Sequence, residues 1–289
     1  MSHLPPPENN RPAGDKVTST GLKTRKLAGE KITALTAFDC LGASILEEAG
    51  VDLILIGDSL ANTSLGYENT LPVSMEEMLS AVRAVSRGSS RAMLVADMPF
   101  GSYQVSIEDS LANAISFVKA GAEAVKIEGG SSRSQLITEL VSNGIPVMGH
   151  IGLTPQSIHT MGGYKIQGKI DEDAQRLVDD ALDLERAGAF SLVLEGIPAE
   201  LAAKITGGLE IPTIGIGAGV GCDGQILVFS DLLGLSAEQK PKFVRQYAEL
   251  RSIAIGAIEN YCRDVRSGDF PSASETYGKI PEKHTENQA

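Results

Sequence analysis

The chain of 289 residues has no tryptophan, few other aromatic residues and only three cysteines. Cys40, Cys222 and Cys262 are odd in number, far apart and without a C-x-x-C pair. From that spacing we expect neither a disulfide framework nor a cysteine-based zinc site. The three are therefore interpreted as buried or incidental thiols, which is how unpaired cysteines usually occur.

Long apolar runs and basic runs are also absent. No run approaches the roughly 20 residues of a membrane helix, and the first residues lack the apolar core of a signal peptide. We therefore expect a soluble, cytoplasmic protein with no membrane contact. The formal net charge of −12 argues against nucleic-acid binding, which needs a basic face. An anionic substrate would need local positive charge from lysine, histidine or a metal ion.

The length allows one domain or two, so the order of predicted elements must decide between them. Residues 1–16 are rich in Pro, Asn and Gly and predict a disordered N-terminal extension, and residues 267–289 predict a C-terminal tail. Between them, in residues 17–266, short apolar runs alternate with longer helical patterns. The predicted strands cover residues 33–38, 53–57, 92–96, 124–127, 146–149, 191–194, 213–216 and 226–229.

These strands are apolar throughout rather than alternating, and a helical pattern fills nearly every gap. Strands of this kind are covered on both faces and joined by crossovers. The sequence therefore predicts the α/β class and a single-domain (β/α)8 TIM barrel over residues 17–266, with a doubly wound open sheet as the alternative. Residues 17–31 predict an N-terminal helix capping the barrel bottom. Residues 236–266 predict a long helix after the last strand.

Two connections are longer than packing requires. Residues 60–73 follow the second predicted strand and residues 151–169 follow the fifth, so both lie on the C-terminal side of the barrel, where barrels carry their function. The second connection is rich in glycine and carries two lysines. It predicts a loop that closes over an anionic ligand.

Five polar residues end successive apolar runs: Asp58, Asp97, Glu128, His150 and Glu195. Residues at the same end of consecutive parallel strands converge in space. The spacing therefore predicts one active site assembled from many elements.

Asp58 and Asp97 are the leading metal candidates, because a small number of hard oxygen ligands suits Mg²⁺. Aspartates after strands are often helix N-caps. However, Asp58 precedes a long loop and Asp97 precedes Met-Pro, so capping explains neither well. Glu128 is interpreted as a third ligand or as a base holding a metal-bound water, with a helix cap as the alternative.

Lys126 shares a strand face with Glu128 by alternation, and a buried lysine requires a negative partner. His150 is one of four histidines and is interpreted as a substrate contact, with a core histidine as the alternative. Glu195 ends an apolar run and is the candidate general base, with a structural ion pair as the alternative.

Residues 219–224, G-V-G-C-D-G, match the dinucleotide-binding pattern G-x-G-x-x-G. The next strand is predicted to begin near Ile226, which leaves no room for the helix that would hold a pyrophosphate. The stretch is therefore predicted to be a glycine-rich turn after the seventh strand, where barrels often bind anions or other ligands.

Many strings of the chain resemble the ketopantoate hydroxymethyltransferase family in family order, from about residue 33 to residue 270. Among them are LTAFD, IGDSL, LPVSMEEM, ADMPFGSY, VKIEGG, GHIGLTPQS, MGGYKIQGK, LVLEG, IPTIGIGAG and DGQILVFSD. The resemblance implies a general base at Glu195 and metal ligands at Asp58 and Asp97, with Glu128 beside the metal. It implies substrate contacts at Asp58, Ser59, Asp97, Lys126 and His150.

The resemblance also implies an activity. It is the transfer of a hydroxymethyl group from 5,10-methylenetetrahydrofolate to 3-methyl-2-oxobutanoate through a Mg²⁺-stabilised enolate, which gives ketopantoate for pantothenate and coenzyme A synthesis. A cytoplasmic homodecamer is implied as well. The chain departs from the family pattern at Gly66-Tyr67-Glu68, where many members have Gly-His-Asp, which bears on a folate or loop contact. Nothing is carried over from Phe270 onward, since FPSASETYG differs from the family's usual ending.

Three other functions fit parts of the pattern. A Mg²⁺-dependent lyase or mutase acting on phosphoenolpyruvate-like acids shares the barrel and metal, but its K-K-C-G-H-type loop is missing here. A Schiff-base aldolase would use Lys126. A non-catalytic binding barrel would not need aspartate, lysine, histidine and glutamate together at one end.

Overall fold

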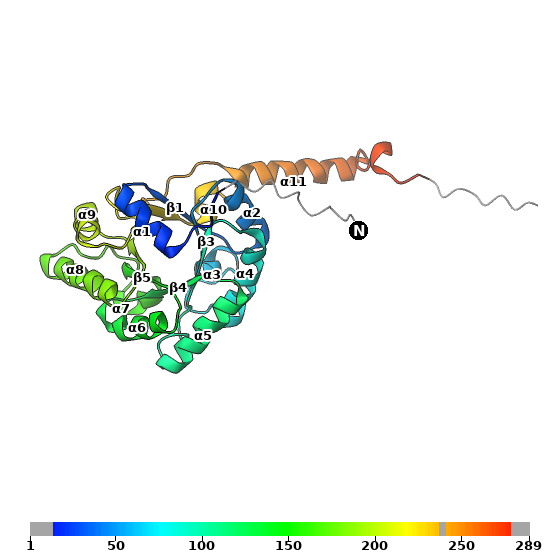
Figure 1. Cartoon of the computed structure of the whole chain (residues 1–289). Coiled ribbons are helices and arrows are strands. Elements are labelled where there is room, and N and C mark those ends of the chain that lie inside the picture. The colour runs from blue at the N-terminus through cyan, green and yellow to red at the C-terminus, as the bar shows by residue number, and fades with distance from the viewer. Residues whose placement is uncertain (1–13, 237–240, 279–289) are drawn as a thin grey trace, which may run out of the picture.

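The eight predicted strands form a closed parallel barrel in which each strand pairs with the next and β8 pairs with β1 (Figure 1). The computed structural model describes residues 14–236 and 241–278. It confirms the single (β/α)8 barrel and excludes the open sheet. The strands are β1 (Ile32–Thr36), β2 (Leu53–Ile56), β3 (Met93–Asp97), β4 (Ala124–Glu128), β5 (Val147–Gly152), β6 (Ser191–Glu195), β7 (Thr213–Ile216) and β8 (Gly224–Leu227).

Six helices pack side by side around the strands: α2 (Cys40–Glu48), α4 (Met75–Gly88), α5 (Ile107–Ala120), α6 (Ser134–Ser142), α8 (Asp171–Arg186) and α9 (Ala199–Gly208). Their apolar faces meet the outer side of the barrel. Four shorter helices lie in the connections between strands: α3 (Leu60–Thr63), η1 (Ser131–Arg133), η2 (Pro155–Ser157) and α7 (Ile158–Met161). Two more follow β8: α10 (Phe229–Leu233) and, beyond α11, η3 (Ala273–Glu275).

Local signals explain where two of the outer helices begin. Ser74 and Glu77 form a reciprocal capping box at the start of α4, which satisfies amide donors that lack partners in the first turn. At the start of α5, Ser106 accepts a hydrogen bond from the backbone amide of Asp109.

The helix α1 (Ser19–Ala28) closes the N-terminal end of the barrel, as predicted. Leu22 is fully buried and belongs to the same apolar cluster as Val17 and Ile32. The ammonium group of Lys26 donates hydrogen bonds to the carbonyl oxygens of Thr206 and Ile211. The bottom of the barrel is therefore filled and tied to α1, which leaves the C-terminal end for the site.

The prediction of one helix over residues 236–266 is wrong in its first half. Residues 241–249 are not helical, and α11 begins only at Leu250 and runs to Ser267. Pro241 has no amide donor for a helix, and the amide of Tyr247 instead donates to the carbonyl of Leu232 in α10. The segment is therefore held against α10 without forming a helix.

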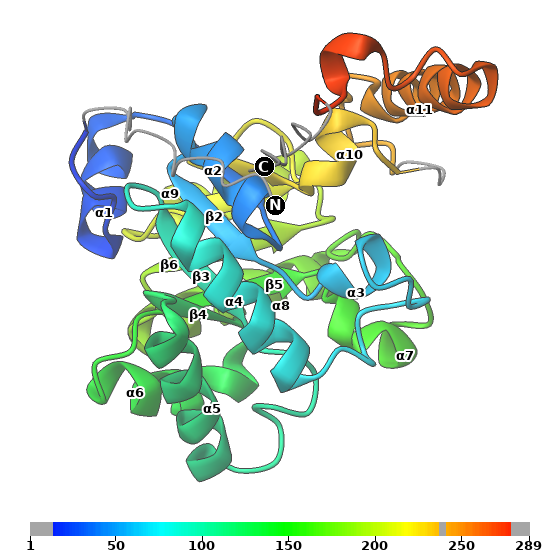
Figure 2. The same cartoon turned by 90° about the vertical axis from the view of Figure 1, so that its right-hand side faces the viewer.

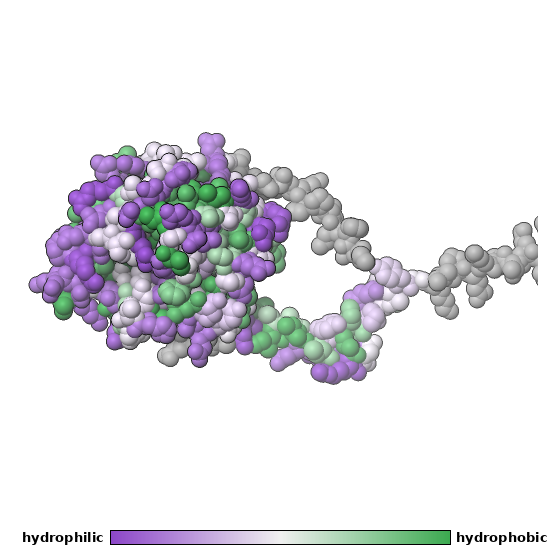
Figure 3. All heavy atoms as spheres, turned by 90° about the horizontal axis from the view of Figure 1, so that it is seen from below, coloured by the Kyte–Doolittle hydropathy of each residue, from purple (hydrophilic) through white to green (hydrophobic). Residues whose placement is uncertain are grey.

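The helix α11 extends away from the barrel in both views (Figures 1 and 2). None of its residues is buried, and apolar side chains such as Ile253, Ile258 and Tyr261 are more than half exposed. Figure 3 shows apolar surface along this projecting arm.

Residues 217–223 connect β7 to β8 with no helix in this described stretch. A side chain on Gly219 would meet Ala199, and one on Gly221 would meet Ala203, so the connection runs tightly against α9. The carboxylate of Asp223 pairs with Lys26 of α1, at the end of the barrel opposite the site. Close packing thus accounts for these glycines without a bound anion.

Some predictions concern residues at the edge of the described chain or beyond it. Residues 1–13 and 279–289, which make up most of the predicted extension and part of the tail, lie outside the described residues.

Cys222 is buried, Cys40 is exposed and Cys262 is intermediate, and all three are free. No described helix has the length and apolarity that crossing a membrane requires.

Candidate active site

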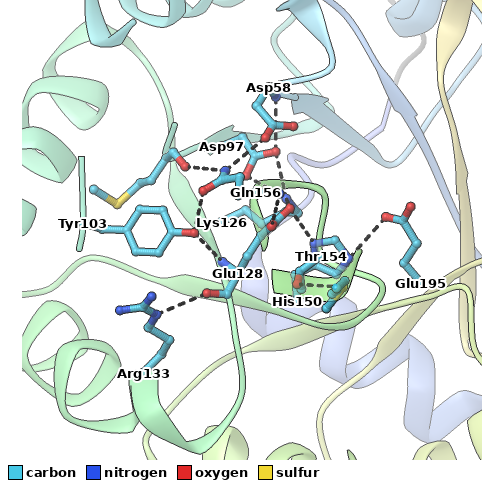
Figure 4. A network of polar contacts seen from close by, with 12 residues as sticks. Asp58, Asp97, Tyr103, Lys126, Glu128, Arg133, His150, Thr154, Gln156 and Glu195 are labelled. Carbon is cyan, nitrogen blue, oxygen red and sulfur yellow. Dashed lines mark hydrogen bonds and ion pairs between the residues drawn. The ribbon is translucent and has the colours of Figure 1, made fainter. Parts of the chain in front are cut away.

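The side chains predicted from strand ends meet at the C-terminal end of the barrel (Figure 4). The register explains the convergence, because Asp97 lies beside Lys126, Glu128 beside His150, and Gly152 beside Glu195. Buried, inward-facing polar side chains on adjacent strands are thereby brought within contact distance. None of the three carboxylates Asp58, Asp97 and Glu128 caps the helix that follows it in the chain, so that alternative is excluded for them.

Lys126 and Asp97 form a buried ion pair. The ammonium nitrogen lies 2.7 and 2.8 Å from the two carboxylate oxygens of Asp97, and both side chains are less than 5% exposed. Burial alone would lower the pKa of Lys126, but Asp97, Glu128 and Asp58 outweigh it and raise that pKa above its usual value. Lys126 is therefore a firmly protonated cation in this site.

Asp58 follows β2 and turns back toward Asp97. Its backbone amide donates to Oδ2 of Asp97 at 3.2 Å, and its side chain is buried. Burial and the negative charges of Asp97 and Glu128 raise the pKa of Asp58 well above its usual value. The mutual repulsion of these negative charges favours a cation beside them.

His150 connects two carboxylates in a row. Its Nδ1 lies 3.2 Å from Oε1 of Glu128, and its Nε2 lies 3.3 Å from Oε2 of Glu195. Burial and Lys126 lower the pKa of His150, but Glu128 and Glu195 raise it more, to about 9. Neither contact has hydrogen-bond geometry, so both nitrogens of His150 and Oε1 of Glu128 are buried polar atoms without hydrogen-bond partners among the described residues.

Glu195 is the most accessible member of the group, with 16% of its side chain exposed, whereas the side chains of Glu128 and His150 are 2% exposed. Gly152, beside it, has a φ of +97°, and a Cβ there would lie 2.2 Å from the carbonyl oxygen of Glu195. Only glycine permits this approach. The end of β5 thereby fixes the backbone that carries Glu195.

Ser59 lies directly after Asp58, half-buried at the start of α3. Its side chain caps nothing, so helix capping does not account for the hydroxyl. Tyr67, where the chain departs from the family pattern, donates from its hydroxyl to Glu77 at 2.8 Å. Tyr67 thus holds the connection after β2 against α4.

Strand-end spacing missed two residues of the site, Gln156 and Tyr103. Gln156 lies in η2 after β5, and its amide nitrogen donates to Oδ2 of Asp58 at 3.0 Å. Tyr103 lies in the connection after β3 and donates from its hydroxyl to the amide oxygen of Gln156 at 2.6 Å. Both occur in the strings GHIGLTPQS and ADMPFGSY, but neither directly ends an apolar run.

The acidic side chains of the site can provide part of the coordination shell of a divalent cation. Among the described residues, no three His, Cys, Asp or Glu side chains are gathered as a complete metal-binding cluster. Mg²⁺ needs fewer protein ligands, because it keeps waters and takes oxygens from its substrate. The carboxylates of Asp58 and Asp97 lie at neighbouring strand ends, and Oε1 of Glu128 makes no hydrogen bond although Nδ1 of His150 lies 3.2 Å from it. These oxygens fit such a partial shell.

Comparisons with known proteins place the whole chain among named relatives. A family model described as ketopantoate hydroxymethyltransferase matches residues 16–273. The chain is 54% identical to the 3-methyl-2-oxobutanoate hydroxymethyltransferase of Carboxydothermus hydrogenoformans over 93% of this chain and 98% of that protein. It is 55% identical to the protein of that name from Koribacter versatilis, over 91% and 89%.

Solved structures share the fold at low identity. A phosphonopyruvate hydrolase complex with oxalate and Mg²⁺ superposes with a TM-score of 0.57 at 16% identity, covering 89% of this chain and 92% of that one. A 2,3-dimethylmalate lyase of the PEP mutase/isocitrate lyase superfamily gives 0.57 at 18% identity, over 89% and 91%. These likenesses show the barrel alone. The family match and the relatives at more than half identity show that this chain belongs to the ketopantoate hydroxymethyltransferase family.

Proposed function

We propose that the chain transfers a hydroxymethyl group from 5,10-methylenetetrahydrofolate to 3-methyl-2-oxobutanoate and so makes ketopantoate for pantothenate and coenzyme A synthesis. The observation that supports it most is the row Glu195, His150 and Glu128 beside the Lys126–Asp97 pair. It combines an accessible carboxylate with buried cationic and polar groups. Removing a proton next to a ketone needs that combination.

Asp58 and Asp97 would hold Mg²⁺, with Glu128 beside it, and the ion would stabilise the negative charge that develops on the keto oxygen. The chain's own residues then divide the remaining tasks. The ammonium group of Lys126 and the imidazole of His150 bind the carboxylate and keto oxygens of the ketoacid. Ser59 adds a hydroxyl next to Asp58.

Glu195 accepts the proton from C3 of the ketoacid, which leaves the electron pair in the enolate. The methylene carbon of the folate is bonded to two nitrogens, so one carbon–nitrogen bond opens to an iminium before C3 of the enolate bonds to that carbon. The second carbon–nitrogen bond then breaks as the oxygen of water replaces the nitrogen, and the proton from C3 and one proton of water end on the two folate nitrogens. Water supplies the oxygen of the new hydroxyl group. Ketoacid, methylenetetrahydrofolate and water thus give ketopantoate and tetrahydrofolate.

Two alternatives are less well supported. A Schiff-base aldolase needs a neutral lysine, whereas Asp97 and its neighbours raise the pKa of Lys126. A phosphoenolpyruvate-type mutase or lyase shares the barrel, but the similar structures of that kind are only 12–18% identical.

The proposed step can be isolated by following deuterium exchange at C3 of 3-methyl-2-oxobutanoate in D2O, with Mg²⁺ and without folate. Glu195→Gln should bind ketoacid yet exchange at least a hundredfold more slowly, in line with the usual contribution of a general base. Glu200→Gln, on the exposed first turn of α9, is the matched control. A wild-type exchange rate in Glu195→Gln would refute the assignment of Glu195 as the base. An exchange rate that is the same with and without Mg²⁺ would refute the proposed metal site.

We also propose that the protein works as a homo-oligomer, a decamer by resemblance. The apolar side chains exposed on α11, together with Leu41 and Ile45 exposed on α2, support association with further copies. Sedimentation velocity on the full chain tests this, and a monomer at micromolar concentration would contradict it.

A further inference from the structure

Gln156 has contacts that packing alone would not require. It is 5% exposed, and it lies at the base of the long connection that follows β5. Its side-chain nitrogen donates to Oδ2 of Asp58 at 3.0 Å and to the backbone oxygen of Met98 at 2.9 Å. Its backbone amide donates to Oε2 of Glu128 at 2.9 Å. One residue thus holds two of the carboxylates assigned to the metal.

Tyr103 completes the arrangement from the connection after β3. It is 3% exposed, and its hydroxyl donates to the amide oxygen of Gln156 at 2.6 Å while accepting the backbone amide of Glu128 at 3.3 Å. The guanidinium of Arg133 lies 5.2 Å from the centre of its ring, and the Nε of Arg133 donates to the backbone oxygen of Glu128. Figure 4 shows these residues around Glu128.

The partners fix which way the amide of Gln156 points. A carboxylate and a backbone carbonyl can only accept hydrogen bonds, so both must face the NH2 group. The hydroxyl of Tyr103 must then donate to the amide oxygen. The reversed amide would set its oxygen against two acceptors, so a single orientation satisfies every group.

From these contacts we infer that Gln156 and Tyr103 are positioning residues that set the carboxylates of Asp58 and Glu128 for a divalent cation. This inference rests on the proposed metal site. One oxygen of each carboxylate is held by Gln156, and Oε1 of Glu128 makes no hydrogen bond, although Nδ1 of His150 lies 3.2 Å from it. Groups that orient metal ligands in this way commonly change metal affinity by about 10- to 100-fold.

The arrangement also connects the long connection after β5 to the strand ends. Through Gln156, residues 153–157 are attached to the segments that follow β2 and β3 and to the end of β4. No comparable contact joins α7, in the same connection, to these carboxylates among the described hydrogen bonds.

The test measures Mn²⁺ binding by electron paramagnetic resonance on the full-length protein, without folate, in wild type, Tyr103→Phe and Gln156→Met. Tyr103→Phe removes only the hydroxyl, and Gln156→Met keeps the length of the side chain. Each should weaken Mn²⁺ binding about tenfold. The double variant should be little worse than Gln156→Met, because Tyr103 acts largely through Gln156.

Gln167→Met is the matched control, because the side chain of Gln167 lies in the same connection and, among the residues that the structure describes, donates only to the backbone of Lys165. Its Mn²⁺ affinity should equal that of wild type. Thermal melting of all variants separates positioning from folding. Lower melting temperatures with unchanged Mn²⁺ affinity in Tyr103→Phe and Gln156→Met would overturn the inference and leave Gln156 a structural residue.

Asp97→Ala separates this inference from the proposed function. If wild type and Asp97→Ala bind Mn²⁺ equally, the metal site itself is wrong. If Asp97→Ala loses Mn²⁺ binding while Gln156→Met and Tyr103→Phe keep it, only the positioning role fails.

Discussion

Glu47 offers a stability test whose size and pH dependence both follow from its contacts. Its carboxylate lies on α2, 4% exposed, and accepts four hydrogen bonds from the segment that leads into β3. Oε1 accepts from the hydroxyl of Ser90 and the amide of Arg91, and Oε2 accepts from the hydroxyl of Ser89 and the amide of Ala92. The strand held in this way ends in Asp97.

Burial would raise the pKa of Glu47, but these four hydrogen bonds lower it from 4.5 to about 2. A pKa difference of that size between the folded and unfolded states corresponds to about 3 kcal/mol of stability at neutral pH. Because the folded pKa is the lower one, the stabilisation is complete above pH 4.5. It is lost as the pH falls from there toward about 2.

Glu47→Gln tests this estimate directly. Whichever way the new amide points, its NH2 group faces the backbone amide of Arg91 or that of Ala92, so one buried donor loses its acceptor. We expect a loss of about 2–3 kcal/mol at pH 7 in urea unfolding, shrinking as the pH is lowered toward 3. Glu48→Gln is the control, since Glu48 is the exposed neighbour on the same helix. A loss below about 0.5 kcal/mol, within the range of ordinary surface substitutions, or one independent of pH, would refute the reasoning.

Two further substitutions test the geometry of the site. Gly152→Ala should destabilise the protein by about 1–3 kcal/mol through backbone strain and also slow C3 exchange, because its Cβ would displace the backbone of Glu195. Gly144→Ala, with a φ of +81° and no neighbour within 4 Å, should show the strain alone, and equal exchange rates in both variants would contradict this. Lys126→Met should cost about 3–5 kcal/mol by leaving Asp97 buried and unpaired. In thermal melting the further change Asp97→Asn should recover part of that loss, and no recovery would contradict the pairing argument.

The sequence was sufficient to predict the barrel and the convergence of the polar strand-end residues for one physical reason. Parallel strands share a direction, so a polar residue at the end of each apolar run must arrive at the same end of the barrel. Alternation along β4 likewise put Lys126 on the face of Glu128, and both are buried there. The ion-pair partner of Lys126 follows from register, which pairs Asp97 with it.

Gln156 and Tyr103 could not be found in this way, because loop residues have no periodicity and their positions depend on how two connections fold over the barrel. The helix predicted over residues 236–266 failed for a related reason. The helical pattern is correct for α11, but the conformation of the segment before it depends on backbone contacts with α10. Such contacts leave no periodic pattern in the sequence.

The buried charges of the chain alone do not explain how an acidic protein attracts an anionic substrate. Four carboxylates, those of Asp58, Asp97, Glu128 and Glu195, surround one ammonium group and one imidazole. Even with His150 protonated, the carboxylates outnumber the cations, and a ketoacid anion would add to the excess. A divalent cation held by Asp58 and Asp97 would reverse that balance where the keto oxygen must lie. Ketoacid and cation should therefore bind cooperatively, each strengthening the other by the same factor.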